Sequence, residues 1–313
     1  MNGLELSRAF FETWGRPMLE EQFPELLPFL AVGVFGPGSD CFGWDDAVSR
    51  DHDFEPGFCL FLPEGAVVDR RSAFLLERAY ARLPRRFEGV ERPLLQPVGG
   101  ARRGVFRTEE FFQKLIGSPN GVFTLKEWLA LPEQALAEAT NGELYFDNWG
   151  EVTRIRENLR RFPEDVRRKK LAGHLLLMEQ AGQYNYPRCL EHGESGAAQL
   201  AVAEFVRSAM AACFLLSGRY LPYYKWSFRA LRALPRFAAL APSFEALLTS
   251  GNDARHVLVK TAQIETAAAA VLAAAREQGL TKAEGSDLER HACAVNDGIR
   301  DAELRNLHIL AAV

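Results

Sequence analysis

The chain has 313 residues, with 37 Lys and Arg against 41 Asp and Glu, which gives a formal net charge of −4 at pH 7. Hydrophobic residues make up 48% and charged residues 25% of the sequence, the proportions of a globular protein rather than a disordered or fibrous one. The slight acidic surplus argues against a dedicated nucleic-acid-binding protein, and we expect no sequence-specific nucleic-acid partner.

Targeting signals and cysteines point to one compartment. Met1–Glu5 lacks the basic start and apolar core of a signal peptide. The longest strongly apolar helical stretch, Thr266–Ala275, is shorter than the roughly 20 residues of a membrane span. The five scattered cysteines include no Cys-x-x-Cys pair, a pattern typical of reduced thiols. We therefore expect a cytoplasmic protein with no membrane partner, and the Ala-rich segment leaves a homo-oligomer open.

Short apolar runs between glycine and proline residues predict strands in the first half of the chain. The predicted strands and helices, in order, are Phe29–Phe35, Phe58–Leu62, helix Arg70–Leu83, Gly104–Arg107, helix Thr108–Ile116 and Glu143–Phe146. This mixture predicts an α+β domain over residues 1–149, with a small mixed sheet and flanking helices.

From residue 150 onward the pattern is helical, rich in Ala, Leu, Arg and Glu. The capping-box pattern Ser286-Asp287-Leu288-Glu289 supports the start of the last helix. We therefore expect an all-helical domain over residues 150–313. Its predicted helices are Gly150–Phe162, Pro163–Gln183, Ser195–Leu216, Tyr223–Leu234, Arg255–Gln278 and Ser286–Ala311.

One segment of the first half carries a pattern with chemical meaning. The strand that ends at Phe35 runs into Gly36-Pro37-Gly38-Ser39, a turn whose backbone N–H groups can approach phosphate oxygens closely. Asp51 and Asp53 follow, and residues two apart on an extended chain face the same side. Two converging carboxylates repel each other unless a cation lies between them, and oxygen ligands suit Mg²⁺ bound together with substrate phosphates.

Three common motifs do not fit this segment. The dinucleotide-binding fingerprint needs a third glycine where Cys41 stands. The P-loop needs a lysine, but Ser39 follows Gly38 directly. A calcium-binding EF-hand that began at Asp51 would have Pro56 in place of its glycine.

The pattern that remains is Gly38-Ser39, eleven intervening residues and then Asp51-x-Asp53. It resembles the signature of the nucleotidyltransferase superfamily with the DNA polymerase β-like fold, which includes the aminoglycoside nucleotidyltransferases. Longer stretches are similar to a bacterial branch of that superfamily known only as a domain of unknown function. These stretches are Gly38–Asp46, Ser49–Pro56, Gln180–Tyr186 and Tyr223–Trp226.

The resemblance implies a reaction and a cofactor. It implies that Gly38 and Ser39 bind the β- and γ-phosphates of a nucleoside triphosphate, and that Asp51 and Asp53 bind two Mg²⁺ ions. The expected enzyme transfers a nucleoside monophosphate, AMP from ATP in the first instance, to a hydroxyl of a small-molecule acceptor and releases pyrophosphate. A third carboxylate on a neighbouring strand is expected to complete the metal site.

We assign the third carboxylate, catalytic and metal-binding, to Asp147. By the strand period of two, Glu143, Tyr145 and Asp147 share one face. The residues around Asp147 resemble the family's, and Glu143 is the second choice. In the alternative interpretation Asp147 only caps the helix that begins near Gly150.

The second half is expected to supply ligand contacts. Lys225, between aromatic residues, is the candidate triphosphate ligand, although a surface lysine packs its stem on aromatic neighbours in the same way. Tyr184, Asn185 and Arg188 are the candidate substrate-binding residues, and a well-packed helix end is the alternative for them.

Two other functions remain open at this point. The same chemistry on a Tyr, Ser or Thr hydroxyl would make the chain a protein nucleotidylation (AMPylation) enzyme. A different class is a non-catalytic nucleotide-binding or antitoxin-like module. The sequence does not identify the acceptor, the preferred base or the oligomeric state.

The charges are unevenly distributed between the halves. Asp40–Glu55 contains six acidic residues against Arg50, and Arg154–Lys170 contains eight basic residues against three acidic ones. We expect the acidic loop and the basic stretch to meet across a metal-bound polyphosphate.

Overall fold

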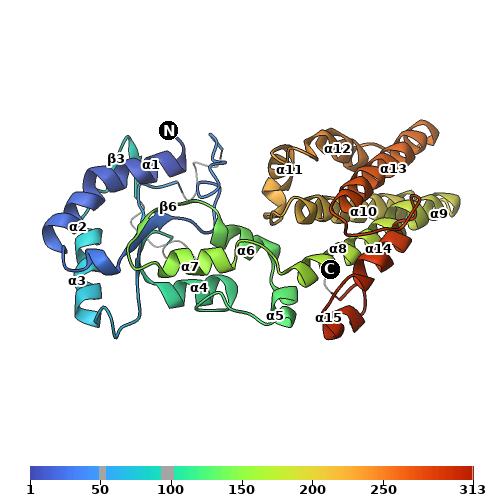
Figure 1. Cartoon of the computed structure of the whole chain (residues 1–313). Coiled ribbons are helices and arrows are strands. Elements are labelled where there is room, and N and C mark those ends of the chain that lie inside the picture. Colours follow the sequence, from blue (N-terminus) through green and yellow to red (C-terminus); the bar gives the residue numbers. More distant parts are fainter. Residues whose placement is uncertain (49–53, 93–101, 312) are drawn as a thin grey trace. The chain divides into compact units, whose positions relative to one another are not determined.

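The computed structural model describes residues 1–48, 54–92, 102–311 and 313 (Figure 1). The chain divides into two compact units: residues 1–122 with 135–160 form unit 1, and residues 123–134 with 161–313 form unit 2. The expected boundary between residues 149 and 150 differs from this division, because helix α7 (Glu151–Asn158) belongs to unit 1 and helix α5 (Leu125–Ala130) to unit 2.

Unit 1 is built on a small mixed sheet of four strands in the order β5-β2-β1-β6. The pairing of β2 with β5 is parallel, and the pairings of β1 with β2 and with β6 are antiparallel. All four strands lie where the apolar runs predicted them. They are β1 (Ala31–Val34), β2 (Cys59–Leu62), β5 (Gly104–Arg107) and β6 (Glu143–Asp147). A separate hairpin, β3 (Arg86–Phe87) with β4 (Val90–Glu91), was not predicted.

Helices cover both faces of this sheet because successive strand residues point to opposite sides. On one face, Leu60 and Leu62 of β2 belong to a core shared with Phe11 and Leu76. The elements on this face are α1 (Gly3–Phe10), the π-helix η1 (Phe11–Gly15), α2 (Arg16–Gln22), the short helix η2 (Leu27–Phe29) and α3 (Arg70–Ala81).

The opposite face is aromatic. Phe61 of β2 stacks on Phe35, with ring centroids 4.9 Å apart. Both rings make edge contacts with Phe111 of helix α4 (Thr108–Ile116). Alternation of Leu60 and Phe61 along one buried strand therefore gives the sheet two separate apolar layers.

Unit 2 is a bundle in which α10 packs against α8, α9, α11, α12, α13 and η4. Gly182 allows one of these contacts, because a Cβ there would lie 2.4 Å from the ring of Phe205. In addition to α5, the elements of unit 2 are α8 (Glu164–Met178), the π-helix η4 (Glu179–Asn185), α9 (Tyr186–Glu191), α10 (Ser195–Leu216), α11 (Tyr224–Arg232), η5 (Ala238–Leu240), α12 (Ala241–Thr249), α13 (Ala254–Glu277), α14 (Leu288–Asp297) and α15 (Ala302–Asn306). Helix α6 (Glu133–Thr140) leads from unit 2 back into unit 1.

The single helix expected over Ser286–Ala311 is wrong. The structure has two helices there, α14 and α15, and the cap of α14 is Asp287 rather than Ser286. The break follows Gly298, where the carboxylate of Asp165 accepts hydrogen bonds from the N–H groups of Arg300 and Asp301. Asp301 then caps α15, so a contact from α8, distant in sequence, ends the helical run.

Two helices are long and apolar enough by length and composition to cross a membrane, which the sequence analysis did not recognise. They are α10 and α13, and 67% of the apolar window of α10 and 39% of that of α13 is buried inside the structure. The burial of α10 among α8, α9, α12 and α13 is that of a core helix.

His174 of α8 generates a prediction about pH. It is buried, and its Nδ1 atom has no hydrogen-bond partner in the part of the chain that the structure describes. Burial lowers the pKa of His174 from 6.5 to about 3. Below pH 6.5 the unfolded chain therefore binds a proton that the folded chain does not bind, so stability falls as the pH falls.

Replacing His174 with leucine should remove this proton uptake. Between pH 7 and pH 5 the wild type should lose about 2 kcal/mol more unfolding free energy than His174→Leu. Urea denaturation of both proteins at the two pH values measures the difference. Equal losses would contradict the prediction.

Candidate functional site

The end of β1 and the starts of β2, β5 and β6 lie at the same edge of the sheet. The pairing of Gly33 with Cys59 places the start of β2 beside the end of β1, and the pairing of Cys59 with Gly104 adds the start of β5. On the other side Val34 pairs with Glu143, the first residue of β6. We call this region the turn edge: the turn Gly36–Ser39 and the starts of β2, β5 and β6.

The turn itself has an unusual backbone. Gly36 and Gly38 have φ angles of 119° and 113°, a region that favours glycine. Both the N–H and the carbonyl of Gly36 bond the side-chain amide of Asn141, each at 2.9 Å. Ser39 is partly exposed. The turn that was predicted to bind phosphate therefore contains two glycines with positive φ angles, and the side chain of Asn141 holds its first residue.

Asp40, directly after the turn, is buried and forms ion pairs with two arginines. Its Oδ1 accepts a hydrogen bond from Nη2 of Arg102 at 2.6 Å, and its Oδ2 pairs with Arg103. The side chains of Asp40 and Arg103 are only 6% and 4% exposed. Both arginines immediately precede β5, so the ion pairs connect the turn to the start of that strand.

Arg102 also lies against the turn. It donates a hydrogen bond to the carbonyl of Pro37 at 2.6 Å. A Cβ on residue 38 would lie 1.9 Å from Nη2 of Arg102, so only glycine leaves room for this cation. Arg102 and Arg103 were not predicted as site residues, because their position depends on the parallel pairing of β5 with β2, which sequence spacing does not report.

Two cysteines close to these arginines are buried thiols. Cys41 and Cys59 are both fully buried. Burial raises the pKa of the Cys41 thiol, and burial raises the pKa of the Cys59 thiol to about 12. A thiol that stays protonated is a poor nucleophile, so these residues pack the edge rather than react there.

Hydroxyl groups fix the start of β2. The Tyr80 hydroxyl accepts from the N–H of Phe58 at 3.1 Å and donates to its carbonyl at 2.8 Å. The Ser7 hydroxyl donates to the carbonyl of Gly57 at 2.6 Å.

Asp51 and Asp53 precede this segment in sequence and lie outside the described residues. Burial raises the pKa of Glu55, against the attraction of Arg103.

The structure gives Asp147 the capping role. Its two carboxylate oxygens accept hydrogen bonds from the N–H of Gly150 at 2.8 Å and of Thr153 at 2.7 Å, which satisfies the amino end of α7. Asp147 pairs with Ala31, so it lies beside the start of β1, away from the turn. Asp147 therefore caps α7, as the alternative interpretation expected, and the register does not place it at the turn edge.

Glu143, the second choice, lies at the turn edge because it pairs with Val34. Its Oε2 accepts from Nη2 of Arg8 at 2.8 Å, and both side chains are more than a third exposed. The guanidinium of Arg8 also lies 4.8 Å from the ring centroid of Tyr145. Glu143 is therefore a carboxylate at the turn edge that forms an exposed ion pair with Arg8.

A complete metal site is not assembled by the described residues. Within residues 1–48, 54–92, 102–311 and 313, no group of three His, Cys, Asp or Glu side chains is arranged to hold a metal ion. The strands on either side of β2 are β1 and β5, and their residues carry no carboxylate. The expected pair Asp51 and Asp53 lies outside the described residues.

The candidate ligand residues of unit 2 are exposed and lie in two places. Lys225 is near the start of α11, and its Nζ lies 5.3 Å from the ring centroid of Trp226, as expected for a lysine packed on an aromatic neighbour. Tyr184 is 51% exposed, and Arg188 lies 5.0 Å from its ring centroid. Asn185 is also exposed. Figure 1 shows α9 and α11 toward opposite ends of α10, so these residues do not form one cluster within unit 2.

Several cations of the basic stretch Arg154–Lys170 are already bound within the protein. Arg156 donates to the carbonyl of Asn141 at 2.6 Å, and Arg167 and Arg168 pair with Glu164. Lys169 is buried and donates to the side-chain carbonyl of Asn296 and to the backbone carbonyl of Leu307. These side chains stabilise the fold locally, and the stretch is divided between the two units.

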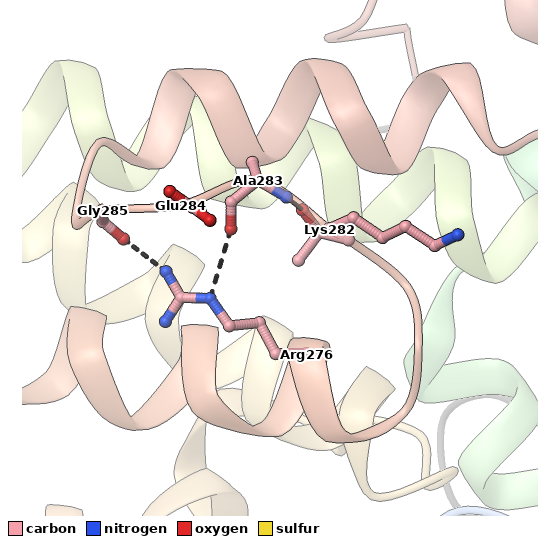
Figure 2. Close-up of a pocket in the computed structure, with 6 residues that line it drawn as sticks. Arg276, Lys282, Ala283, Glu284 and Gly285 are labelled. Carbon is pink, nitrogen blue, oxygen red and sulfur yellow. Dashed lines mark hydrogen bonds between the residues drawn. The ribbon is translucent and has the colours of Figure 1, made fainter.

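An open depression of about 580 Å³ lies beside the loop between α13 and α14 (Figure 2). Arg276 crosses it and bonds the carbonyls of Ala283 and Gly285, while Lys282 points away. None of the predicted site residues lines it. The guanidinium of Arg276 is used to hold the loop, so we assign no chemistry to this depression.

Comparison with known proteins gives one match. Residues 128–227 match the family model described as Domain of unknown function (DUF4037). No curated protein and no solved structure matches the chain. The matched segment contains Asp147, Tyr184 and Lys225, whereas the turn at Gly38 and the pair Asp51 and Asp53 precede it. The match names a family without describing an activity.

The capping role of Asp147 yields the second prediction. Replacing Asp147 with alanine leaves two N–H groups at the amino end of α7 without their partner. The unfolding free energy should fall by about 0.5–2 kcal/mol, measured by urea denaturation. A protein as stable as the wild type would show that the cap contributes nothing.

The buried ion pairs of Asp40 yield the third. The Asp40→Asn variant leaves Arg103 buried without its counter-charge, so the unfolding free energy should fall by about 3–5 kcal/mol. Glu12→Gln is the matched control, because it removes an exposed ion pair with Arg16 in the same unit and should cost less than about 1 kcal/mol. Similar losses in the two variants would contradict the importance of the buried pairs.

Proposed function

We propose that the chain is a Mg²⁺-dependent nucleotidyltransferase that transfers a nucleoside monophosphate, AMP from ATP in the first instance, to a hydroxyl of a small-molecule acceptor. One observation carries the proposal: the glycine turn that ends β1 meets the start of β2 at a single edge, and the sequence Asp51-x-Asp53 leads into that strand. We further propose the nucleotidyltransferase-like fold for unit 1 and a helical substrate domain for unit 2.

The turn edge suits the phosphates of a nucleotide. The positive φ angles of Gly36 and Gly38 give the turn a backbone conformation that favours glycine, and backbone N–H groups in glycine turns of this kind can bind anions. Arg102 adds a guanidinium beside Gly38, and a planar guanidinium matches phosphate geometry. Ser39 adds a partly exposed hydroxyl. In this proposal Gly38 and Ser39 bind the β- and γ-phosphates.

The metal ligands of the proposal are Asp51 and Asp53, with Glu143 in place of Asp147. Glu143 fits better because it begins β6 at the turn edge, while Asp147 caps α7 at the far end of the strand. Bound divalent ions would supply positive charge to the oxygens that attack and leave the phosphorus.

The bond changes in the proposed reaction balance without a further reagent. The acceptor hydroxyl oxygen forms a bond to the α-phosphorus, and the bond from that phosphorus to pyrophosphate breaks. The hydroxyl proton passes to a carboxylate at the turn edge, for which Glu143 is the candidate among the described residues. In unit 2, Lys225 remains the proposed contact for the triphosphate, and Tyr184, Asn185 and Arg188 those for the acceptor.

A second candidate is a nucleotide-binding module without catalysis. It is favoured by the absence of carboxylates on β1 and β5, the two strands that flank β2 and are described in full. Such a module would retain the turn and its arginines and would bind a nucleotide without cleaving it.

The fourth prediction separates these candidates. With Mg²⁺ and ATP labelled in the α-phosphate, in a small-molecule cell extract, the wild type should transfer label and Asp53→Asn should not. Asp147→Asn should retain transfer, since its carboxylate caps α7. Equal labelling by the wild type and Asp53→Asn would contradict catalysis by this site.

Binding is measured alongside transfer. ATP with Mg²⁺ at about 100 times its Kd should stabilise the wild type by about 2.7 kcal/mol, visible as a higher melting temperature. Stabilisation without label transfer would support the second candidate. No stabilisation would exclude both.

A further inference from the structure

Asn141 holds the backbone at the first residue of the glycine turn. Its side-chain oxygen accepts from the N–H of Gly36 and its side-chain NH₂ donates to the carbonyl of Gly36, both at 2.9 Å. A carboxamide oriented in this way satisfies both backbone groups of one residue, because it carries both an acceptor and a donor. The side chain thus replaces a strand partner for Gly36, which lies two residues beyond the last pair of the ladder, Val34 with Glu143.

The backbone around Asn141 is itself fixed. Gly142 has a φ angle of 63°, and a Cβ there would lie 2.0 Å from the carbonyl oxygen of Val34. This close approach requires glycine and sets the distance between the start of β6 and the end of β1.

Arg156 of α7 also binds the backbone at Asn141. It donates to the carbonyls of Thr140 at 3.1 Å and of Asn141 at 2.6 Å. Its guanidinium lies 4.5 Å from the ring centroid of Phe35, the residue before Gly36. Burial lowers the pKa of Arg156 to about 10, so it remains charged at neutral pH and keeps both hydrogen bonds.

We propose that Asn141 is a positioning residue for the glycine turn: by clamping Gly36 at both its N–H and its carbonyl, it directs the N–H groups of the turn toward the phosphates of the nucleotide. This inference rests on the proposed function. It goes beyond it by assigning a role to a residue outside the Gly38-Ser39 and Asp51-x-Asp53 pattern.

The test compares three variants. Asn141→Asp keeps the acceptor for the N–H of Gly36 but places an oxygen against its carbonyl. Asn141→Ala removes both bonds. Asn148→Ala is the matched control, because Asn148 follows the other end of β6 and donates one side-chain hydrogen bond, to the carbonyl of Leu27 at 2.8 Å.

Two measurements are made on each protein. Calorimetric titration with ATP and Mg²⁺ should show at least about tenfold weaker binding for Asn141→Asp and Asn141→Ala, because the net contribution of roughly one to two hydrogen bonds is lost. Binding should be unchanged for Asn148→Ala. Hydrogen exchange without nucleotide should be faster in peptides that contain Gly36 in Asn141→Ala, which lacks the acceptor for the N–H of Gly36, and unchanged in Asn148→Ala.

The outcomes are distinct. If the wild type binds ATP and the Asn141 variants bind it with the same affinity, the positioning role is overturned and the proposed function still stands. Equal weakening in Asn148→Ala would show a general loss of stability and would also overturn the role. No binding by the wild type would overturn the proposed function, and unchanged exchange at Gly36 would overturn the clamp independently of any ligand.

Discussion

The buried contact of Asp40 with Arg102 and Arg103 is the constraint on which the turn edge depends. A carboxylate that is removed from water must be paired, and a guanidinium in the same place needs its counter-charge. The pairing connects the turn after β1 to the start of β5 across β2. The first helix adjusts to it as well, since a Cβ on Gly3 would lie 2.4 Å from Cβ of Asp40. One acid therefore orders the turn, a strand start and a helix start.

Hydrogen bonds between uncharged groups also stabilise the turn edge. Most strands of this sheet have only four residues, so few ladder hydrogen bonds hold each end. Side chains from three directions supply the rest: Ser7 from α1, Tyr80 from α3 and Asn141 from the corner before β6. Each bonds a backbone group at the turn edge. The edge is thus rigid because side chains replace missing strand partners there, while the rest of each strand is buried between two apolar layers.

Local patterns in the sequence predicted most of the fold. Helices α4 and α10 and strand β5 begin and end at the predicted residues, because apolar period and punctuation by Gly and Pro act locally. The site was predicted only in part. The Gly36–Ser39 turn is a local motif and was found, whereas Arg102, Arg103 and Asn141 reach it through strand order. The register of β6 against β1 also separates Glu143 from Asp147. The strand period of two predicted one shared face, but the pairing shifts between Val32 and Gly33, which breaks the alternation, and the two carboxylates lie at opposite ends of β1.

Burial separates the charges that build the fold from those that remain available to a ligand. Asp40, Arg103 and Lys169 are buried and paired or hydrogen-bonded, and their replacement would disturb the structure whatever the chain binds. In η4, Gly182 serves packing against Phe205, while Tyr184 on the same π-helix is exposed, and π-helices occur frequently at functional sites. The motif that carries the resemblance in unit 2 is therefore divided between a structural glycine and exposed polar and aromatic groups. Under the proposed function, these exposed groups are the ones accessible to an acceptor, so its specificity should be tested in their variants rather than in those of the buried residues.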